Sequence, residues 1–241
     1  MPPAELAGML LRQRDRLLEL GVQVTGAVDM ARVFRSTSVL FEGAQGVLLD
    51  PDFGTYPFVT SGSCMAHGVS SVGFSTFELD DVAGVLKAYT TRVGEGPFPT
   101  EEDSPVTQGI RERGAEFGAT TGRPRRIGWL DLPALRYAAL RSGLTSLVIT
   151  KADVLNGLER VRACTGYRVD GVVRDMPSTT HDFFVAEPVY EDLAGWQTTD
   201  DVNFLKYMTF IEQQVGVPIT YISYGPHTEE METKSHLIMT I

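Results

Sequence analysis

The sequence predicts an α/β fold in which a mostly parallel central sheet is flanked by helices. Residues 144–150 form a nearly continuous apolar and β-branched run, which is typical of a strand buried on both faces of a parallel sheet. Residues 131–142 before this run and 154–160 after it have helical patterns, so helix and strand alternate as in α/β proteins. The composition, 43% hydrophobic and 22% charged, is that of an ordinary globular protein.

Elements on the amino-terminal side follow from spacing and turn residues. A first helix should begin at the Pro2-Pro3 pair and end at Gly21, because leucines recur near helical spacing between these points. The other expected elements are a short buried strand at 39–41, a tight loop at 42–46, a helix at 79–89 and a loop at 94–99.

The second half of the chain contains further predicted elements. A turn at Asp170-Gly171 between two β-prone runs, 161–167 and 169–173, indicates a hairpin. The last two elements are a helix at 204–215 and a strand at 218–223. Because the sequence shows no internal repeat and no linker, residues 1–241 are predicted to form a single domain.

The chain is acidic, with 21 Lys and Arg against 31 Asp and Glu and a formal charge of −10. Nucleic acids and anionic membranes attract an excess of cationic side chains, so neither is an expected partner. Cys64 and Cys164 have no metal-binding spacing, which predicts reduced thiols. The first residues do not resemble a signal peptide and no apolar run is long enough to span a membrane, so a cytoplasmic location is expected.

The segment Thr150-Lys151-Ala152-Asp153 follows the predicted buried strand and has the form [NT]KxD of a guanine-specificity element. A fixed carboxylate accepts the N1 and N2 hydrogens of guanine as a pair, and the lysine stem lies along the base. Adenine lacks this pair of donors. The alternative is an exposed lysine and an aspartate that caps a following helix. The position after a buried strand favours the nucleotide interpretation, because α/β sheets bind ligands at that edge.

A second candidate site is the cationic loop at residues 120–126, which reads Thr-Thr-Gly-Arg-Pro-Arg-Arg in an acidic protein. Hydroxyls, a glycine and several guanidiniums in one short segment can hold a carboxylate or phosphate through forked, charge-assisted hydrogen bonds. The alternative is a solvated run of charge. Gly122 and Pro124 argue against a plain helix face, so the pattern favours an anion-binding loop.

Two glycine-containing segments, 42–46 and 54–61, offer backbone donors and hydroxyls that suit a nucleotide, although such turns are common. A guanine clamp usually accompanies a GxxxxGK[ST] phosphate loop, and this sequence contains no such motif. Either the clamp interpretation is wrong, or the phosphate-binding part lies outside this sequence.

Taken together, these segments resemble adenylosuccinate synthetase, the enzyme that joins L-aspartate to IMP using GTP. The resemblance covers about residues 39–228 in the order of the family. The matching stretches are FEGAQGVLLD (41–50), GTYPFVTS (54–61), LKAYTTRVGEGPFPTE (86–101), EFGATTGRPRRIGWLD (116–131), TKADVLNGL (150–158), EPVYEDLAGW (187–196) and ISYGP (222–226).

The resemblance implies the P-loop NTPase-like α/β fold of this family, present here as an incomplete carboxyl-terminal portion. It also implies phosphoryl transfer from GTP to the 6-oxygen of IMP, followed by displacement of phosphate by the amine of aspartate. The implied cofactor is Mg²⁺. The family keeps its phosphate loop, its catalytic aspartate and histidine and its metal ligands in an amino-terminal part. We therefore assign no catalytic or metal-binding residue here and expect the chain alone to be inactive.

The resemblance further implies roles for individual residues. The expected IMP contacts are Gln45, Thr60, Val93 with Gly94, and Arg123. The expected aspartate loop consists of Ala119, Thr120, Thr121, Gly122, Arg123, Pro124 and Arg125. The expected GTP contacts are Arg125, Lys151, Ala152, Asp153, Ser223, Tyr224 and Gly225. The complete enzyme is expected to be a homodimer, and an amino-terminal companion chain is a possible partner.

Some features depart from the family pattern. Pro124 interrupts what is often an unbroken arginine run, residues 63–67 replace an Asn-Thr-Thr-rich stretch, and the region 195–203 is short. These features are compatible with a phage-type homologue that uses dGMP in a 2-aminoadenine pathway. A non-catalytic guanine-nucleotide-binding module is an alternative from a different class. IMP remains the first choice of substrate.

Overall fold

The computed structural model describes residues 1–23, 25–118, 122–225 and 227–235. The helices are α1 (Pro3–Glu19), α2 (Ala27–Ser36), α3 (Pro105–Arg113), α4 (Leu132–Ser142), α5 (Thr180–Val185) and α6 (Val202–Val215). The strands are β1 (Ala83–Lys87), β2 (Thr90–Arg92), β3 (Arg126–Gly128), β4 (Leu130–Asp131), β5 (Ser146–Thr150), β6 (Arg160–Val169), β7 (Val172–Arg174), β8 (Glu187–Ala194), β9 (Ile219–Ser223) and β10 (Met231–Thr233). The 3-10 helices are η1 (Val47–Leu49), η2 (Ala66–Val72), η3 (Thr76–Glu78), η4 (Asp153–Leu155) and η5 (Thr228–Glu230).

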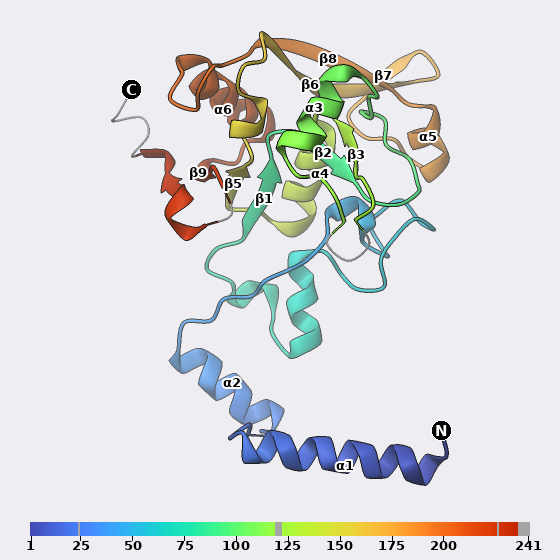
Figure 1. The fold of residues 1–241 in the computed structure, drawn as a ribbon, viewed down its shortest axis with the longest axis vertical. Helices are drawn as coiled ribbons and strands as arrows, with labels where there is room; N and C mark the ends of the chain where they lie inside the picture. Colours follow the sequence, from blue (N-terminus) through green and yellow to red (C-terminus); the bar gives the residue numbers. More distant parts are fainter. Residues whose placement is uncertain (24, 119–121, 226, 236–241) are drawn as a thin grey trace.

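The central sheet has the strand order β1-β5-β9-β10 (Figure 1). Strands β1, β5 and β9 are parallel and β10 is antiparallel, which confirms the predicted mostly parallel sheet. Strand β5 is apolar because it has a partner on each side and fully buries Leu147 and Ile149. The ladders align Lys87 with Thr150 and Thr150 with Ser223. The carboxyl ends of the three parallel strands therefore meet at one edge.

A second sheet is built around the long strand β6. It pairs in parallel with β4 and antiparallel with β7 and β8. The predicted hairpin between β6 and β7 is confirmed, and Asp170 (φ 52°) and Gly171 (φ 77°) both adopt the positive φ that a two-residue turn of this kind needs. Strand β8, which no sequence pattern predicted, covers the other edge of β6. A short antiparallel ladder pairs β2 with β3.

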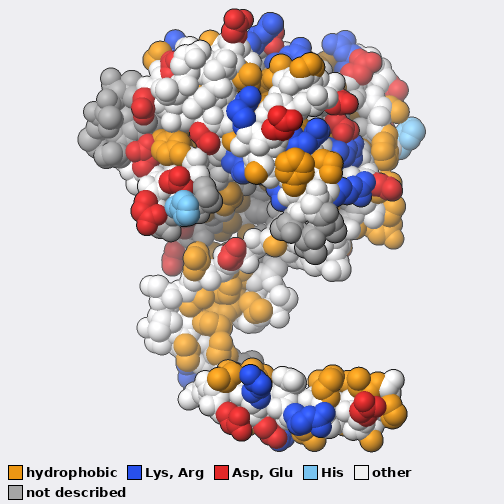
Figure 2. Space-filling model, in the orientation of Figure 1, with side chains coloured by type: hydrophobic (Ala, Val, Ile, Leu, Met, Phe, Trp, Pro, Cys, Tyr) orange, Lys and Arg blue, Asp and Glu red, His pale blue; other side chains and the backbone are white. Residues whose placement is uncertain are grey.

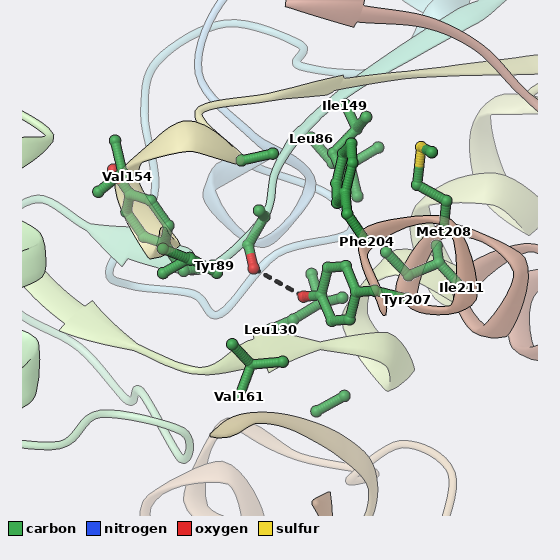
Figure 3. Packing of buried hydrophobic residues seen from close by; sticks show 14 of the residues in the cluster. Leu86, Tyr89, Leu130, Ile149, Val154, Val161, Phe204, Tyr207, Met208 and Ile211 are labelled. Carbon is green, nitrogen blue, oxygen red and sulfur yellow. Dashed lines mark hydrogen bonds between the residues drawn. The ribbon is translucent and has the colours of Figure 1, made fainter. Parts of the chain in front are cut away.

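The hydrophobic core lies between the strands and helix α6 (Figure 3). One face of α6 buries Phe204, Tyr207, Met208 and Ile211. These side chains belong to the same cluster as Leu86 of β1 and Ile149 of β5. The Tyr207 hydroxyl donates to the Ala88 carbonyl at 2.7 Å, the dashed contact in Figure 3. This bond fixes α6 to the chain as it leaves β1.

Helices α1 and α2 form an arm that projects from the rest of the molecule (Figure 1). The end of α2 contacts the segment near η3, where Phe34 packs against Phe74 and Arg35 pairs with Glu78. Helix α1 lies where the leucine spacing predicts it, and Gly21 after it has a φ of 80°. It buries none of its residues, and Figure 2 shows apolar side chains in the open on this arm. The exposed apolar residues of α1 are Leu6, Met9, Leu10, Leu11, Leu17 and Leu18. No helix in the described ranges is long and apolar enough to cross a membrane.

Three predicted elements are wrong. Residues 39–41 are not a buried strand but a connection from the arm, with Leu40 94% exposed, because no described strand pairs with them. Residues 79–89 contain strand β1 instead of a helix, because pairing with β5 outweighs the helical spacing of the apolar residues. The helix predicted at 154–160 shrinks to η4, since strand β6 begins at Arg160.

Candidate functional site

The guanine-clamp motif lies at the carboxyl edge of the central sheet. Lys151 follows β5 directly, and its backbone N–H donates to the Ser223 carbonyl at the end of β9, at 3.2 Å. Lys151 has a φ of 58°, a conformation that a non-glycine residue adopts only when its surroundings hold it there. The fold thus brings the ends of β5 and β9 together at the place where α/β sheets bind ligands.

Asp153 opens the short helix η4 and carries an unsatisfied acceptor. Its Oδ1 atom is buried and has no hydrogen-bond partner among the described residues. Burial raises the pKa of this carboxyl group, because the charged form loses water, and the nearby Glu230 adds to the effect. Buried polar atoms are nearly always paired, so an unpaired carboxylate oxygen at this edge is an acceptor available to a ligand.

Neighbouring residues fix the shape of this edge. Ala152 is fully buried, and its carbonyl accepts from the Trp196 indole at 3.2 Å. The Ser223 hydroxyl donates to the Gly225 carbonyl at 3.1 Å. A Cβ on Gly225 would lie 2.3 Å from the Glu230 carboxylate, so a larger residue there would have to displace the Glu230 side chain. Tyr224 turns away from this edge, because its hydroxyl contacts Glu232 on β10.

The cationic loop is closed at its base by backbone pairing. Phe117 and Pro124 form an antiparallel bridge, and the Gly118 N–H donates to the Arg123 carbonyl at 2.8 Å. Gly122 has a φ of 64°, which places it in the left-handed region. The predicted residues Ala119, Thr120 and Thr121 lie outside the described residues. The described part is therefore a narrow hairpin that ends at Arg125.

A fully buried carboxylate, that of Glu116, connects this hairpin with the guanine motif. It accepts hydrogen bonds from Lys87 Nζ at 2.7 and 2.8 Å, from the Tyr89 hydroxyl at 2.7 Å and from Arg125 Nη1 at 2.7 Å. The Nζ atom of Lys151 lies 4.0 Å from the same carboxylate. We call these five residues the Glu116 cluster.

The electrostatics of the Glu116 cluster favour the ionised carboxylate. Burial opposes the charge on Glu116, but hydrogen bonds from Lys87, Tyr89 and Arg125 and the positive charge of Lys87 outweigh it, so its pKa lies below the usual value. Burial lowers the pKa of the Lys87 amine and raises the pKa of the Tyr89 hydroxyl. Three cationic side chains around one carboxylate give the Glu116 cluster a net positive charge.

The residues predicted to contact IMP, other than Arg123 of the cationic loop, come from the loops at 45–60 and 93–94. Gln45 is exposed in a left-handed conformation, with a φ of 64°, and Val93 is 51% exposed. The Thr60 N–H donates to the Leu49 carbonyl at 2.8 Å. Buried Asp50 holds this loop together by accepting from the backbone N–H groups of residues 52, 53 and 64, at 2.9, 3.1 and 2.8 Å.

Two arginines join the IMP-side loops to the cationic hairpin. Arg92 is buried and donates to the Phe58 carbonyl at 3.0 Å and to the Glu95 carbonyl at 3.1 Å. Arg126 donates to the Gly96 carbonyl at 2.8 Å. Because Arg126 follows Arg125, these bonds connect the loops near residues 58 and 95 to the Glu116 cluster. Hydrogen bonds and the β2–β3 ladder therefore link the described candidate residues on these loops to the Glu116 cluster.

Other features of the surface do not contribute to this site. The described residues include no group of three or more His, Cys, Asp or Glu that could hold a metal ion. A surface hollow of about 720 Å³ lies at the opposite end of β5 and β9, lined by Ser146, Glu212 and Ile219 among others, and no described candidate residue lines it.

A sequence model of the family described as adenylosuccinate synthetase matches residues 3–232 of this chain. The chain belongs to the adenylosuccinate synthetase family. The adenylosuccinate synthetase of Petrotoga mobilis is 67% identical over 232 residues, which are 96% of this chain and 55% of that protein. The chain thus spans about half the length of the curated relatives it matches.

Solved structures agree with this assignment. The fully ligated adenylosuccinate synthetase of Plasmodium falciparum superposes with a TM-score of 0.87 at 35% identity, over 94% of this chain and 57% of that one. The succinoaminodeoxyadenylate synthetase of cyanophage S-2L, bound to dGMP and dATP, superposes with a TM-score of 0.59 at 18% identity, over the same shares of the two chains. The second comparison concerns the fold alone.

Four residues that support the candidate site have no role assigned from the sequence. Lys87, Tyr89 and Arg92 lie within the family stretch at 86–101, and Glu116 opens the family stretch at 116–131, four positions before the cationic loop. A lone carboxylate next to a cationic segment was a usable signal for Glu116. No sequence pattern could show that Lys87 and Tyr89 converge on Glu116, or that Arg92 contacts the loop near residue 58, because these contacts join segments far apart in the chain.

Proposed function

We propose that this chain is the guanine-nucleotide-binding and amino-acid-binding portion of an adenylosuccinate synthetase, the GTP-dependent ligase that joins L-aspartate to IMP in purine nucleotide synthesis. The observation that carries the proposal is the unpartnered, buried Asp153 carboxylate oxygen beside Lys151. Guanine presents N1–H and N2–H donors on one edge, and a fixed carboxylate can accept both. A buried acceptor without a hydrogen-bond partner lowers the stability of the unliganded chain, and a ligand that donates to this acceptor removes that cost.

The remaining roles follow from the same resemblance. The loop from Ala119 to Arg125 would hold the carboxylates of L-aspartate, with Arg125 also reaching GTP. Gln45, Thr60, Val93 and Arg123 would face IMP. The side chains of this chain would bind and orient the three substrates, while phosphoryl transfer requires the phosphate-binding part found elsewhere in the family. The proposed complete enzyme uses Mg²⁺ bound outside this chain, is a homodimer and works in the cytoplasm.

IMP is proposed over dGMP as the purine substrate. The support is the 67% identity to a protein named adenylosuccinate synthetase, against 18% to the phage enzyme. An amino-terminal companion chain that supplies the phosphate loop is part of this proposal.

The test of the proposal is base specificity at Asp153. Asp153→Asn keeps the shape but places an amide donor where guanine needs an acceptor, so at least one charge-assisted bond is lost. At about 1.5–3 kcal/mol per bond to a charged group, GDP affinity should fall roughly ten- to a hundredfold. The affinity for XDP, which has a carbonyl at position 2, should fall less or should rise, because the Asn amide can donate to that carbonyl. Competition between GDP and XDP measures both.

The matched control is Asp170→Asn in the β6–β7 turn, where asparagine also tolerates the positive φ. This substitution should leave both affinities unchanged. An equal loss for the two bases in Asp153→Asn, or no loss for either, would mean that Asp153 is only part of a helix start and that the guanine assignment is wrong.

A further inference from the structure

We propose that Glu116 is a positioning residue for guanine-nucleotide binding: its buried carboxylate holds Arg125 of the cationic hairpin and Lys151 of the clamp in one charge cluster, so the two segments are oriented together. The inference rests on the proposed function and extends it to a residue to which the family resemblance assigned no role. Glu116 does not reach the ligand edge itself, because its side chain is fully buried. Its effect must therefore pass through its partners.

The backbone fixes where the Glu116 carboxylate lies. Its N–H donates to the Arg111 carbonyl at the end of α3, and its carbonyl accepts from the Arg125 N–H, both at 2.9 Å. The Arg111 guanidinium in turn donates to the Arg125 carbonyl at 2.9 Å. Helix α3 thus anchors both ends of the hairpin and points the carboxylate at β1 and the end of β5. Arg125 is held by one Nη bond to Glu116, while its buried Nε has no partner among the described residues.

Lys151 has its Nζ atom 4.0 Å from the same carboxylate. Its Nζ donates to the Gly114 carbonyl at 2.6 Å, at the carboxyl end of α3 where a cation is favoured. A Cβ on Gly114 would lie 2.4 Å from the Tyr89 hydroxyl, so glycine there leaves room for the Tyr89 bond to Glu116. The Lys151 stem therefore lies in a fixed direction beside Asp153.

Removing the charge of Glu116 should release this arrangement. Lys87, Arg125 and Lys151 would then repel one another around a neutral side chain, and the half-buried Lys87 would lose the carboxylate that pairs with it. The Lys151 side chain is 39% exposed and can move into water. The clamp would lose its orientation although none of its own residues has changed.

The experiment compares Glu116→Gln, which keeps shape and removes charge, with the matched control Glu102→Gln. Glu102 also accepts from a buried ring donor, Trp129 Nε1 at 2.8 Å, and pairs with Arg162, but lies outside the Glu116 cluster. The first measurement is GDP affinity on the full chain. We expect at least a tenfold loss for Glu116→Gln and less than a twofold change for the control.

A second measurement needs no nucleotide. Acetic anhydride labelling, read by mass spectrometry, reports how freely the Lys151 and Lys87 amines react. We expect Lys151 to react at least five times faster in Glu116→Gln and at an unchanged rate in Glu102→Gln. If Glu116→Gln does not fold, Glu116→Asp keeps the charge but shortens the reach, and it should show a smaller rise in Lys151 labelling.

The two measurements separate this inference from the proposed function. A chain that binds no GDP at all counts against the proposed function, and Lys151 labelling then decides the role of Glu116 alone. Unchanged Lys151 labelling in Glu116→Gln overturns the inference in every case. Faster labelling with unchanged GDP affinity also overturns it, because Glu116 would then be a structural residue with no effect on the clamp.

Discussion

At the scale of single residues, backbone conformation marks two of the candidate positions. Gln45 and Lys151 have φ values of 64° and 58°, which cost energy in residues with a Cβ. Such conformations concentrate at functional sites because the surrounding structure holds them in place. Asp170, with a φ of 52°, has the ordinary explanation of a hairpin turn.

Asp50 is the residue on which the loop around Thr60 depends. Burial opposes its charge, but backbone hydrogen bonds from residues 64, 52 and 53 and one from the Ser63 hydroxyl outweigh it, so its pKa lies below the usual value. A carboxyl group whose pKa is lower in the folded state stabilises the fold above its unfolded pKa, and this contribution is lost as the pH falls through the folded pKa.

We predict that Asp50→Ala lowers the free energy of unfolding at pH 7 by about 3 kcal/mol, because three backbone N–H groups and the Ser63 hydroxyl lose the same acceptor. Urea unfolding measures the change. Asp52→Ala removes a neighbouring exposed carboxylate and should cost less than about 0.5 kcal/mol. Equal costs for the two substitutions would show that Asp50 does not organise the loop.

At the scale of elements, helix α4 starts at a buried acid. Asp131 is its N-cap and accepts from the Ala134 N–H at 3.1 Å, while the Tyr167 hydroxyl donates to both of its carboxylate oxygens. Burial raises the pKa of Asp131 to about 6, and the hydrogen bond from Tyr167 only partly offsets this. The charged form is therefore less favoured in the folded chain than in the unfolded one.

The sign of the resulting pH dependence follows from this raised pKa. The folded pKa of about 6 exceeds the unfolded value of about 4, so the stabilisation is present below pH 4 and is lost as the pH rises through 6. We predict that the wild-type chain gains about 1 kcal/mol of stability from Asp131 between pH 7 and pH 5. In Asp131→Asn this part of the gain should disappear. Urea unfolding of both proteins at the two pH values gives the difference, and identical pH profiles would refute the assignment.

Helix α6 depends on one buried hydrogen bond. Tyr207→Phe removes the donor to the Ala88 carbonyl and leaves that buried oxygen unsatisfied. We predict a loss of about 1–3 kcal/mol in the free energy of unfolding. Tyr221→Phe on the half-exposed side of β9 is the control and should change stability by less than about 0.5 kcal/mol. A loss no larger than that of the control would show that water replaces the Tyr207 hydroxyl.

At the scale of the whole molecule, the described residues expose apolar surface on the arm and at the edge of the central sheet. The arm exposes one face of α1, and β1 lies at the edge of the central sheet with Val85 74% exposed. Uncovered strand edges and apolar patches favour association with other chains. A companion polypeptide of the family is the partner we propose for these surfaces.

We predict that the chain by itself associates with increasing concentration. Replacing Leu10 and Leu17 by Glu should shift the mass measured by light scattering after size exclusion toward that of the monomer. Val172→Glu, at an exposed position on β7 far from the arm in sequence, should not. A stable monomer at every concentration would contradict the prediction that these surfaces need a partner.

Elements with strong local patterns could be recognised from the sequence alone. It predicted β5 because a run of apolar residues on both faces fits a buried parallel strand, and it predicted the β6–β7 hairpin because Asp170-Gly171 fits its turn. The sequence also identified the family, because the family's motifs and their order can be recognised without knowing how the chain packs. The clamp residues Lys151 and Asp153 were named from this information, and their roles remain a prediction.

Features that depend on residues far apart in the chain could be found only from the three-dimensional structure. Residues 83–87 are a strand because β5 offers a ladder, although their spacing fits a helix, and residues 39–41 have no such ladder. The Glu116 cluster could not be predicted, because Lys87, Arg125 and Lys151 come from three separate segments and meet only when the sheet forms. Local sequence sets local propensity, whereas burial and charge pairing are set by which segments the fold brings together.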